Sequence, residues 1–290
     1  MNSESYTFQN LMVATDGSEQ SKKAFNQALE VFSSGNLFKV IHVIHVSNKE
    51  KTYLPKHFTL ENIEQEYKTE LLSRLTSNRY NLIFQEKNNK YQHSREQILD
   101  ICSQAKGDFL FIGYTGRKGP KNDPTVLSQT VRGVAFNQMI PLVIIKELFV
   151  RKNQASGGFT FLVGIDGSKK SLKCLHIAAS LANNPNDKLI ACFAPSPDRI
   201  KQIDEINQKV QNEMAQINFQ NWQYVSLQPN YDSGEAIINY VNLNEEVDVQ
   251  FVIVKYNLYL CIKVIELFLT DRQQRFQSRK RKESILWQKC

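Results

Sequence analysis

The residues best suited to bind a ligand form a short motif that occurs twice. Asp16-Gly17-Ser18 follows an apolar run, and Asp166-Gly167-Ser168 follows a similar run 150 positions later. In each copy a carboxylate and a hydroxyl come where a strand ends and a helix begins. This is the edge of an open α/β sheet at which ligands bind. The match continues beyond the motif, which indicates an internal repeat of one domain: Ser21 with Ser171, Lys23 with Lys173, Ala28 with Ala178.

A pair of glycines offers complementary chemistry. Gly113 and Gly116 follow the predicted buried strand 108–112. Strands one and four of a doubly wound sheet are neighbours, so we expect Asp16 and Gly113 to face one crevice. A carboxylate there accepts hydrogen bonds from ribose hydroxyls, while glycine amides approach phosphates closely. The alternative is structural: the glycines only shape a turn, and Asp16 only caps its helix.

Alternating strands and helices position these groups in the first half. Such alternation requires parallel crossovers and predicts a doubly wound α/β sheet. Ser18 is placed to cap the first helix. His42 and His45 lie in the second strand without a third metal ligand nearby, so we interpret them as hydrogen-bonded strand histidines. Strands are predicted at 11–13, 36–46, 82–84, 108–112 and 141–145, and helices at 18–32, 60–76, 94–101 and 126–136.

The second half repeats the start of this pattern and loses its end. No glycine or proline follows Val254, so the glycine loop and the proline-led last strand are missing. Residues 261–269 are predicted to form an apolar helix or strand. Predicted here are strands at 160–165, 189–194 and 249–254 and a helix at 172–182. The predicted organisation is a domain at 1–146, a linker at 147–158, a degenerate second domain at 159–270 and a disordered basic tail at 271–290.

Charge and composition limit the functional classes. The 290 residues are 41% hydrophobic and 22% charged, which is typical of globular domains. The net charge is +7, but residues 271–290 alone carry a surplus of five positive charges. The basic character therefore belongs to the tail and not to a nucleic-acid-binding face.

Membrane and disulfide classes are also disfavoured. No run approaches the roughly 20 apolar residues of a membrane span, and the N-terminus lacks a signal-peptide pattern. We expect a soluble cytoplasmic protein. Five widely spaced cysteines without a CxxC pair indicate reduced, mostly buried thiols rather than disulfides or a zinc site.

Together these features resemble the universal stress protein family in its tandem form. The resemblance covers most of residues 6–146 and, more weakly, 159–254. It implies two tandem flavodoxin-like, Rossmann-like domains with parallel sheets, dimerised through the last strand. It also implies a regulatory protein that is not an enzyme, with ATP or AMP as ligand, together with Mg²⁺. The residues that carry it are the Asp-Gly-Ser turn, the strand ending at His45-Val46, Gly113-Tyr114-Thr115-Gly116 and the strand 141–145.

The nucleotide motif matches only in part. Nucleotide-binding members carry Gly-x-x-Gly, nine residues, then Gly and a hydroxyl residue. Here Ser128 replaces the third glycine after eleven residues, and Gln129 replaces the hydroxyl residue. Ser128 and Thr130 still offer hydroxyls at a helix N-terminus, where anions are favoured. The resemblance maps adenine and ribose contacts to Asp16 and the backbone near Val46. The candidate nucleotide site is Thr15, Asp16, Gly17, Val46, Gly113, Gly116, Arg117, Ser128, Gln129 and Thr130.

The second domain is not expected to bind a nucleotide in the family manner. Asp166 and Ala194 occupy the positions of the carboxylate and of the strand end. Larger residues stand in place of the glycines and would obstruct a phosphate. Depending on how the late strand is aligned, Gly113 corresponds to Lys255 or Ile253, and Gly116 to Leu258 or Tyr256.

The expected function is therefore a regulatory module that binds ATP or AMP in its first domain. The alternative is a ligand-free interaction scaffold in which the two copies form an internal pseudo-dimer, with another protein or a second copy as partner. No Walker sequence, metal cluster or Ser/His/Asp arrangement is identified, and no residue set supports ATP hydrolysis.

The end of the chain leaves two further alternatives. The basic run 278–282 is read as a solvated charge run or as a nuclear localisation signal or nucleic-acid patch. The loss of family features after Val254 is also consistent with a retained intron or a frame error.

Overall fold

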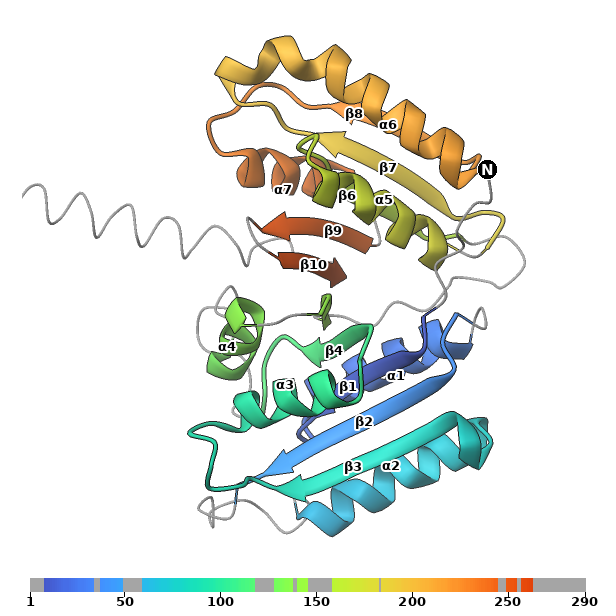
Figure 1. The fold of residues 1–290 in the computed structure, drawn as a ribbon, viewed down its shortest axis with the longest axis vertical. Helices are drawn as coiled ribbons and strands as arrows, with labels where there is room; N and C mark the ends of the chain where they lie inside the picture. Colours follow the sequence, from blue (N-terminus) through green and yellow to red (C-terminus); the bar gives the residue numbers. More distant parts are fainter. Residues whose placement is uncertain are drawn as a thin grey trace, which may run out of the picture.

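The computed structural model describes residues 8–33, 37–48, 59–117, 128–137, 140–145, 158–182, 184–244, 249–254 and 257–262. The first half (8–145) and the second half (158–262) contribute strands to one ten-stranded sheet, with β9 and β10 between the two sets (Figure 1). The strand order is β3-β2-β1-β4-β5-β10-β9-β6-β7-β8. The predicted α/β class is confirmed. The predicted tail, and all of the linker except Gly158, lie outside the described residues.

The first half forms the predicted parallel sheet. Each of its five strands pairs in parallel with its neighbours, so all their carboxyl ends lie at one edge. The strands are β1 (Asn10–Thr15), β2 (Val40–Ser47), β3 (Tyr80–Glu86), β4 (Phe109–Gly113) and β5 (Leu142–Ile145). The helices are α1 (Glu19–Ser33), α2 (Leu60–Arg74), α3 (Ser94–Gln104) and α4 (Gln129–Asn137), with a 3-10 turn at Ser77–Arg79.

The second half mirrors this order up to its fourth strand. β8, β7, β6 and β9 pair in parallel in that sequence, as β3, β2, β1 and β4 do. The strands are β6 (Thr160–Gly164), β7 (Lys188–Phe193), β8 (Trp222–Ser226) and β9 (Val249–Val254). The helices are α5 (Lys169–Leu181), α6 (Ile203–Ile217) and α7 (Ser233–Leu243), with a 3-10 helix, η3, at Pro197–Gln202.

The last strand departs from the predicted parallel arrangement. β10 (Asn257–Ile262) runs antiparallel to β9 and parallel to β5. Only residues 255–256 connect β9 to β10, whereas a parallel crossover needs a dozen or more residues. The short connection therefore forces the chain to reverse direction.

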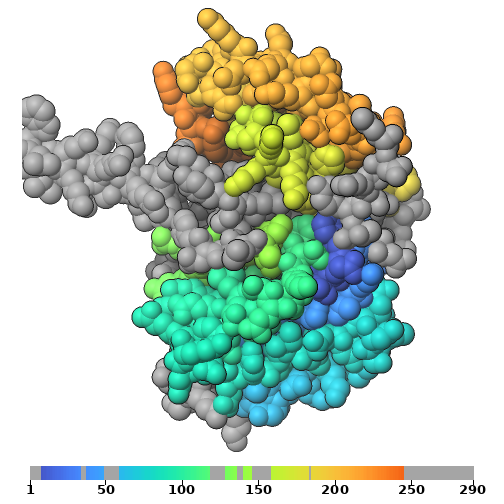
Figure 2. Space-filling view, viewed as in Figure 1, coloured from blue at the N-terminus to red at the C-terminus, as the bar shows by residue number. Residues whose placement is uncertain are grey.

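β10 also determines how the two halves meet. It pairs with β5 over four residues, from Tyr259 with Leu142 to Ile262 with Ile145. In the space-filling view the described residues of the first half gather at one end and those of the second half at the other (Figure 2). The β5 edge, through which the resemblance implies dimerisation, is thus occupied by a strand of the same chain.

The cores follow from the alternation of side chains along buried strands. In β1, Leu11 and Val13 join a cluster that extends under α1, α2, α5 and α6 across both halves. Met12 and Ala14 point to the opposite face, where a second cluster lies under α3 and α4. A smaller third cluster includes Val241 of α7. No helix among the described residues has the length and apolar character to cross a membrane.

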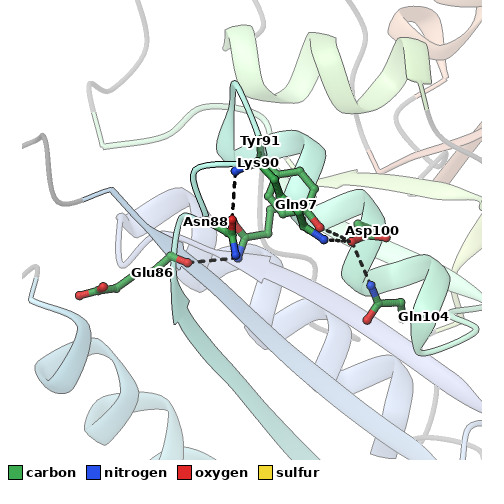
Figure 3. A network of polar contacts seen from close by, with 7 residues as sticks. All are labelled: Glu86, Asn88, Lys90, Tyr91, Gln97, Asp100 and Gln104. Atoms are coloured by element: carbon green, nitrogen blue, oxygen red, sulfur yellow. Dashed lines mark hydrogen bonds and ion pairs between the residues drawn. The ribbon is translucent and has the colours of Figure 1, made fainter.

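The connection from β3 to α3 is held by a polar network at the carboxyl edge of β3 (Figure 3). Gln97 is only 4% exposed. Its Oε1 accepts a hydrogen bond from the Asn88 amide at 2.8 Å, and its Nε2 donates to the Glu86 carbonyl at 3.1 Å. Nearby, the Asp100 carboxylate accepts from the Tyr91 hydroxyl and from Gln104. The Tyr91 hydroxyl holds the pKa of Asp100 below its ordinary value.

Substituting Gln97 with alanine is expected to lower the free energy of unfolding by about 1–3 kcal/mol, because it removes the two hydrogen bonds that this buried side chain makes to the main chain of Asn88 and Glu86. Urea denaturation measures this change. Gln104→Ala is the matched control, since its bond to Asp100 is exposed, and it should change stability by less than about 0.5 kcal/mol. Equal effects of the two substitutions would contradict the role assigned to Gln97.

Candidate functional site

The turn after β1 is built around Asp16. Gly17 has φ of 79°, a left-handed conformation that favours glycine. Asp16 Oδ1 accepts a hydrogen bond from the Ser18 amide at 3.0 Å. Ser18 Oγ in turn accepts from the Ser21 amide at 3.3 Å, which confirms Ser18 as the cap of α1.

The second motif folds in the same way. Gly167 has φ of 80°. The Ser168 amide donates to Asp166 Oδ1 at 2.9 Å, and the Ser171 amide donates to Ser168 Oγ at 3.2 Å. The repeated sequence therefore has a repeated local structure.

The glycine segment after β4 reaches Asp16. The Arg117 amide donates to Asp16 Oδ2 at 2.9 Å. A Cβ atom on Gly116 would lie 2.8 Å from the same oxygen, so glycine permits this approach. The structure thus brings the Asp-Gly-Ser turn and the glycine segment into direct contact.

The Arg117 side chain extends away from β4. Its Nε donates to the main-chain oxygen of Asp16, and its Nη2 lies 3.4 Å from Nε2 of His45 in β2. The guanidinium therefore bridges the carboxyl ends of β1 and β2. The sequence placed Arg117 among the candidate nucleotide-site residues and gave no indication of this bridge.

His45 is a structural neighbour of the site. It is 1% exposed, and its Nδ1 lies 2.8 Å from the Thr15 carbonyl oxygen. Since a carbonyl only accepts, Nδ1 carries the proton and Nε2 of the neutral ring is an acceptor for Arg117. Burial lowers the pKa of His45, and the Arg117 charge adds to this. His42 lies 3.1 Å from Asn10 Oδ1, so both histidines are hydrogen-bonded strand residues as predicted.

Stability is expected to fall as the pH drops below about 6.5. The pKa of His45 is lowered from 6.5 in the folded protein, so the unfolded chain binds the proton more readily. The neutral ring therefore contributes stability above pH 6.5 that is lost as the pH falls toward the folded pKa. Urea denaturation at pH 7.5 and pH 5.5 tests this, and His45→Gln should flatten the dependence. A steeper pH dependence in the variant would refute the assignment of this effect to His45. Burial also lowers the pKa of His42, and this histidine supplies the remaining pH dependence.

Gly113 has a packing role that the sequence did not reveal. A Cβ atom there would lie 2.5 Å from the main-chain oxygen of Gln20 and 3.0 Å from the Ser21 nitrogen. The end of β4 is therefore packed directly against the first turn of α1. Close packing alone is sufficient to explain a glycine at this position.

The N-terminus of α4 is fixed beside the end of β4. The Ser128 amide donates to the Tyr114 carbonyl at 3.3 Å. Ser128 Oγ accepts from the Val131 amide at 3.2 Å and so caps the helix. Gln129 and Thr130 are exposed in its first turn. The loop 118–127 lies outside the described residues.

Val46 and Thr115 also belong to the surroundings of the candidate nucleotide site. Val46 pairs with Gln85 at the carboxyl end of β2 and is partly buried. Thr115, between the two glycines, is 5% exposed, and its hydroxyl has no hydrogen-bond partner among the described residues. A buried hydroxyl without a partner costs free energy, which a polar ligand atom or water can recover. Sequence reasoning missed Thr115, although its place between Gly113 and Gly116 was a usable signal.

The register of β9 settles the alignment of the second half. Val13 pairs with Phe111, and the equivalent Val163 pairs with Phe251. Two residues further on, Ile253 occupies the position of Gly113. By the same count Tyr256 takes the position of Gly116, outside the described residues.

An arginine also contacts the second motif, but from another segment. Arg199, in η3 after β7, donates from Nη2 to the main-chain oxygen of Asp166 at 2.8 Å and from Nε to Gln202 at 2.7 Å. Asp166 itself is exposed. Hydrogen bonds from Ser168 hold the pKa of Asp166 below its ordinary value, and the Arg199 charge adds to them.

The described residues offer neither a group of metal ligands nor a reactive thiol. Within the described ranges, no group of three or more His, Cys, Asp or Glu residues is arranged to hold a metal ion. Cys102, Cys174 and Cys192 are free and buried, as predicted. Burial raises the pKa of each thiol to about 12, so none is a reactive thiolate at neutral pH.

Comparison with known families identifies the first half. A model described as the universal stress protein family matches residues 7–146. These residues form a universal stress protein domain. The resemblance inferred from the sequence is confirmed for this part of the chain. A comparison with curated proteins found no match.

Solved structures show the universal stress protein fold over more of the chain. A universal stress protein from Archaeoglobus fulgidus DSM 4304 is 17% identical, with 83% of this chain and 84% of that chain covered and a TM-score of 0.56. A functionally unknown protein from Pseudomonas aeruginosa PAO1 is 11% identical, with 91% and 96% covered and a TM-score of 0.54. At these identities the likeness concerns the fold alone, and it extends into the second half.

Proposed function

We propose that the universal stress protein domain binds an adenine nucleotide, ATP or AMP, and that binding regulates contacts with other proteins. The observation that carries this proposal is the hydrogen bond between the Arg117 amide and Asp16 Oδ2. It joins a carboxylate to a glycine-rich backbone segment at the carboxyl edge of β1 and β4, which supports the proposal of a shared binding crevice at this edge. Ligands of open α/β sheets bind at such an edge.

Each part of the crevice has a proposed role. Asp16 accepts hydrogen bonds from ribose hydroxyls, and the backbone near Val46 contacts the base. The amides near Gly116 and the exposed first turn of α4, at Gln129 and Thr130, bind phosphates. Mg²⁺ accompanies ATP through its phosphate oxygens. The proposed role is regulatory, as the family resemblance implies.

The second half is proposed as a degenerate copy that does not bind a nucleotide. The proposed units are residues 1–146 and 159–270. Support comes from the shared turn geometry and from Ile253 at the position of Gly113. A phosphate could not approach the backbone closely past such a residue.

The second candidate function is a ligand-free scaffold. It is favoured by Ser128 at the position of the third glycine and by β10, which occupies the β5 edge within one chain. In this case the two halves act as an internal pseudo-dimer that binds other proteins.

Analysis of the purified protein separates the two functions. Mass spectrometry of small molecules released on denaturation should detect ATP or AMP. Adding ATP and Mg²⁺ should raise the melting temperature, by an amount that grows with ligand concentration. Absence of both results would favour the scaffold.

A further inference from the structure

The Arg117 guanidinium lies on one side of the crevice. β2 and β4 flank β1 on opposite sides, roughly 10 Å apart by ordinary strand spacing. The N-terminus of α4 is tied to the residue after β4, through Ser128 and Tyr114. Arg117 instead contacts Asp16 and His45, at the ends of β1 and β2. Its charge is therefore held on the side opposite the anion-binding groups.

Chemistry assigns the two sides to different parts of a nucleotide. The helix N-terminus and glycine segment suit phosphates, and Asp16 suits ribose hydroxyls. The ribose and base then lie toward the ends of β1 and β2, where the guanidinium is found. Accordingly, this inference rests on the proposed function and concerns how the same site chooses its ligand.

We propose that Arg117 makes binding depend on phosphate. In the ligand-free protein its guanidinium occupies the nucleoside side of the crevice, bonded to the Asp16 carbonyl and His45. An entering nucleotide displaces it, and the released guanidinium pairs with a phosphate. An unphosphorylated nucleoside must break the same contacts without offering a new partner.

The exchange favours a charged ligand. Two of the contacts that are displaced are made to neutral acceptors, a carbonyl oxygen and an imidazole nitrogen. A phosphate carries negative charge and accepts two parallel hydrogen bonds from a guanidinium, so it attracts Arg117 more strongly than either neutral acceptor does. Arg117 directly follows Gly116, so its main chain can stay in place while its side chain rotates toward the phosphate.

Arg199 provides a matched control within the same molecule. Like Arg117, it donates from its guanidinium to the main-chain oxygen of the motif aspartate, here Asp166. It belongs to the half that is proposed not to bind a nucleotide. Its removal tests whether the loss of such a contact has a general effect on the protein.

Calorimetric titration of the full chain with adenosine, AMP and ATP tests the inference. Wild type should prefer ATP over adenosine strongly. In Arg117→Ala the adenosine affinity should rise and the ATP affinity should fall or stay level, so their ratio should drop by about tenfold or more. Arg117→Lys, which keeps the charge but not the planar fork, should give an intermediate ratio. Arg199→Ala should keep the wild-type ratio.

The outcomes separate this inference from the function on which it rests. An unchanged ATP-to-adenosine ratio in Arg117→Ala would overturn the inference and leave nucleotide binding intact. A ratio that falls equally in Arg199→Ala would also overturn it. No binding of any adenine compound to wild type or variants would refute the proposed function itself. If Arg117→Ala proves unstable, Arg117→Lys keeps a positive charge at this position and allows the same comparison in a folded protein.

Discussion

Replacing Gly113 with valine is expected to lower the free energy of unfolding by about 3 kcal/mol, the upper end of the usual cost of overpacking. The first added carbon would lie 2.5 Å from the Gln20 oxygen and 2.6 Å from the Gln20 carbonyl carbon. These are backbone atoms in the first turn of α1, so no side-chain rotation relieves the clash. Urea denaturation of the variant beside wild type measures the loss.

Gly116→Ala is the matched control for this substitution. Its Cβ would lie 2.8 Å from Asp16 Oδ2, a side-chain atom that can move by rotation. We expect this variant to remain folded with a smaller loss of stability. If Gly113→Val were as stable as wild type, the close packing of β4 against α1 would be wrong. Because of this clash, the valine variant is unsuitable for testing phosphate binding.

Replacing Asp16 with asparagine is expected to weaken ATP binding by about tenfold to a hundredfold. Hydrogen bonds to a charged group contribute about 1.5–3 kcal/mol, and a neutral amide offers one acceptor oxygen instead of two. Asparagine still presents an oxygen to the Ser18 amide, so the cap of α1 is preserved. Calorimetric titration with ATP and Mg²⁺ gives the change in affinity.

Asp166→Asn is the corresponding change in the second half. The turn around Asp166 has the same hydrogen bond from the serine two residues later, so Asp166→Asn reproduces the change within the turn but not the loss of the acceptor for the Arg117 amide. Only the change at Asp16 should affect ATP. Equal affinities of the two variants would place the nucleotide elsewhere.

The first half was predictable because its pattern is local. Apolar runs such as 109–112 and 142–145 are continuous, as expected for strands covered on both faces, and the Asp-Gly-Ser turns mark the starts of helices. The neighbouring positions of strands one and four then follow from the strand order of doubly wound folds. The convergence of Asp16 with the glycine segment is a consequence of that order, and the contact of Asp16 with Arg117 agrees with it.

The second half was less predictable because its signals are weaker. The sequence analysis placed no element between residues 194 and 249, where α6, β8 and α7 lie. β8 is only partly buried, and its residues from Trp222 to Ser226 mix polar and apolar types without a clear run. The direction of β10 depends on the shortness of the connection 255–256. The expectation that the second half would repeat the first concealed this reversal of direction.

The detailed contacts of the site could not be predicted because they join segments that are distant in sequence. The clash that requires Gly113 involves α1, more than 90 positions earlier in the chain. The bridge from Arg117 to His45 also joins residues far apart in sequence. Such contacts are set by tertiary packing and leave no periodic trace in the sequence.

The most direct test of the central proposal is hydrogen exchange by mass spectrometry with and without ATP and Mg²⁺. The account predicts slower exchange in the turn at 15–18, in the glycine segment 113–117 and in the first turn of α4. The turn at 165–168 should exchange at the same rate in both conditions. Protection confined to the second half, or no protection at saturating ATP, would contradict nucleotide binding by the universal stress protein domain.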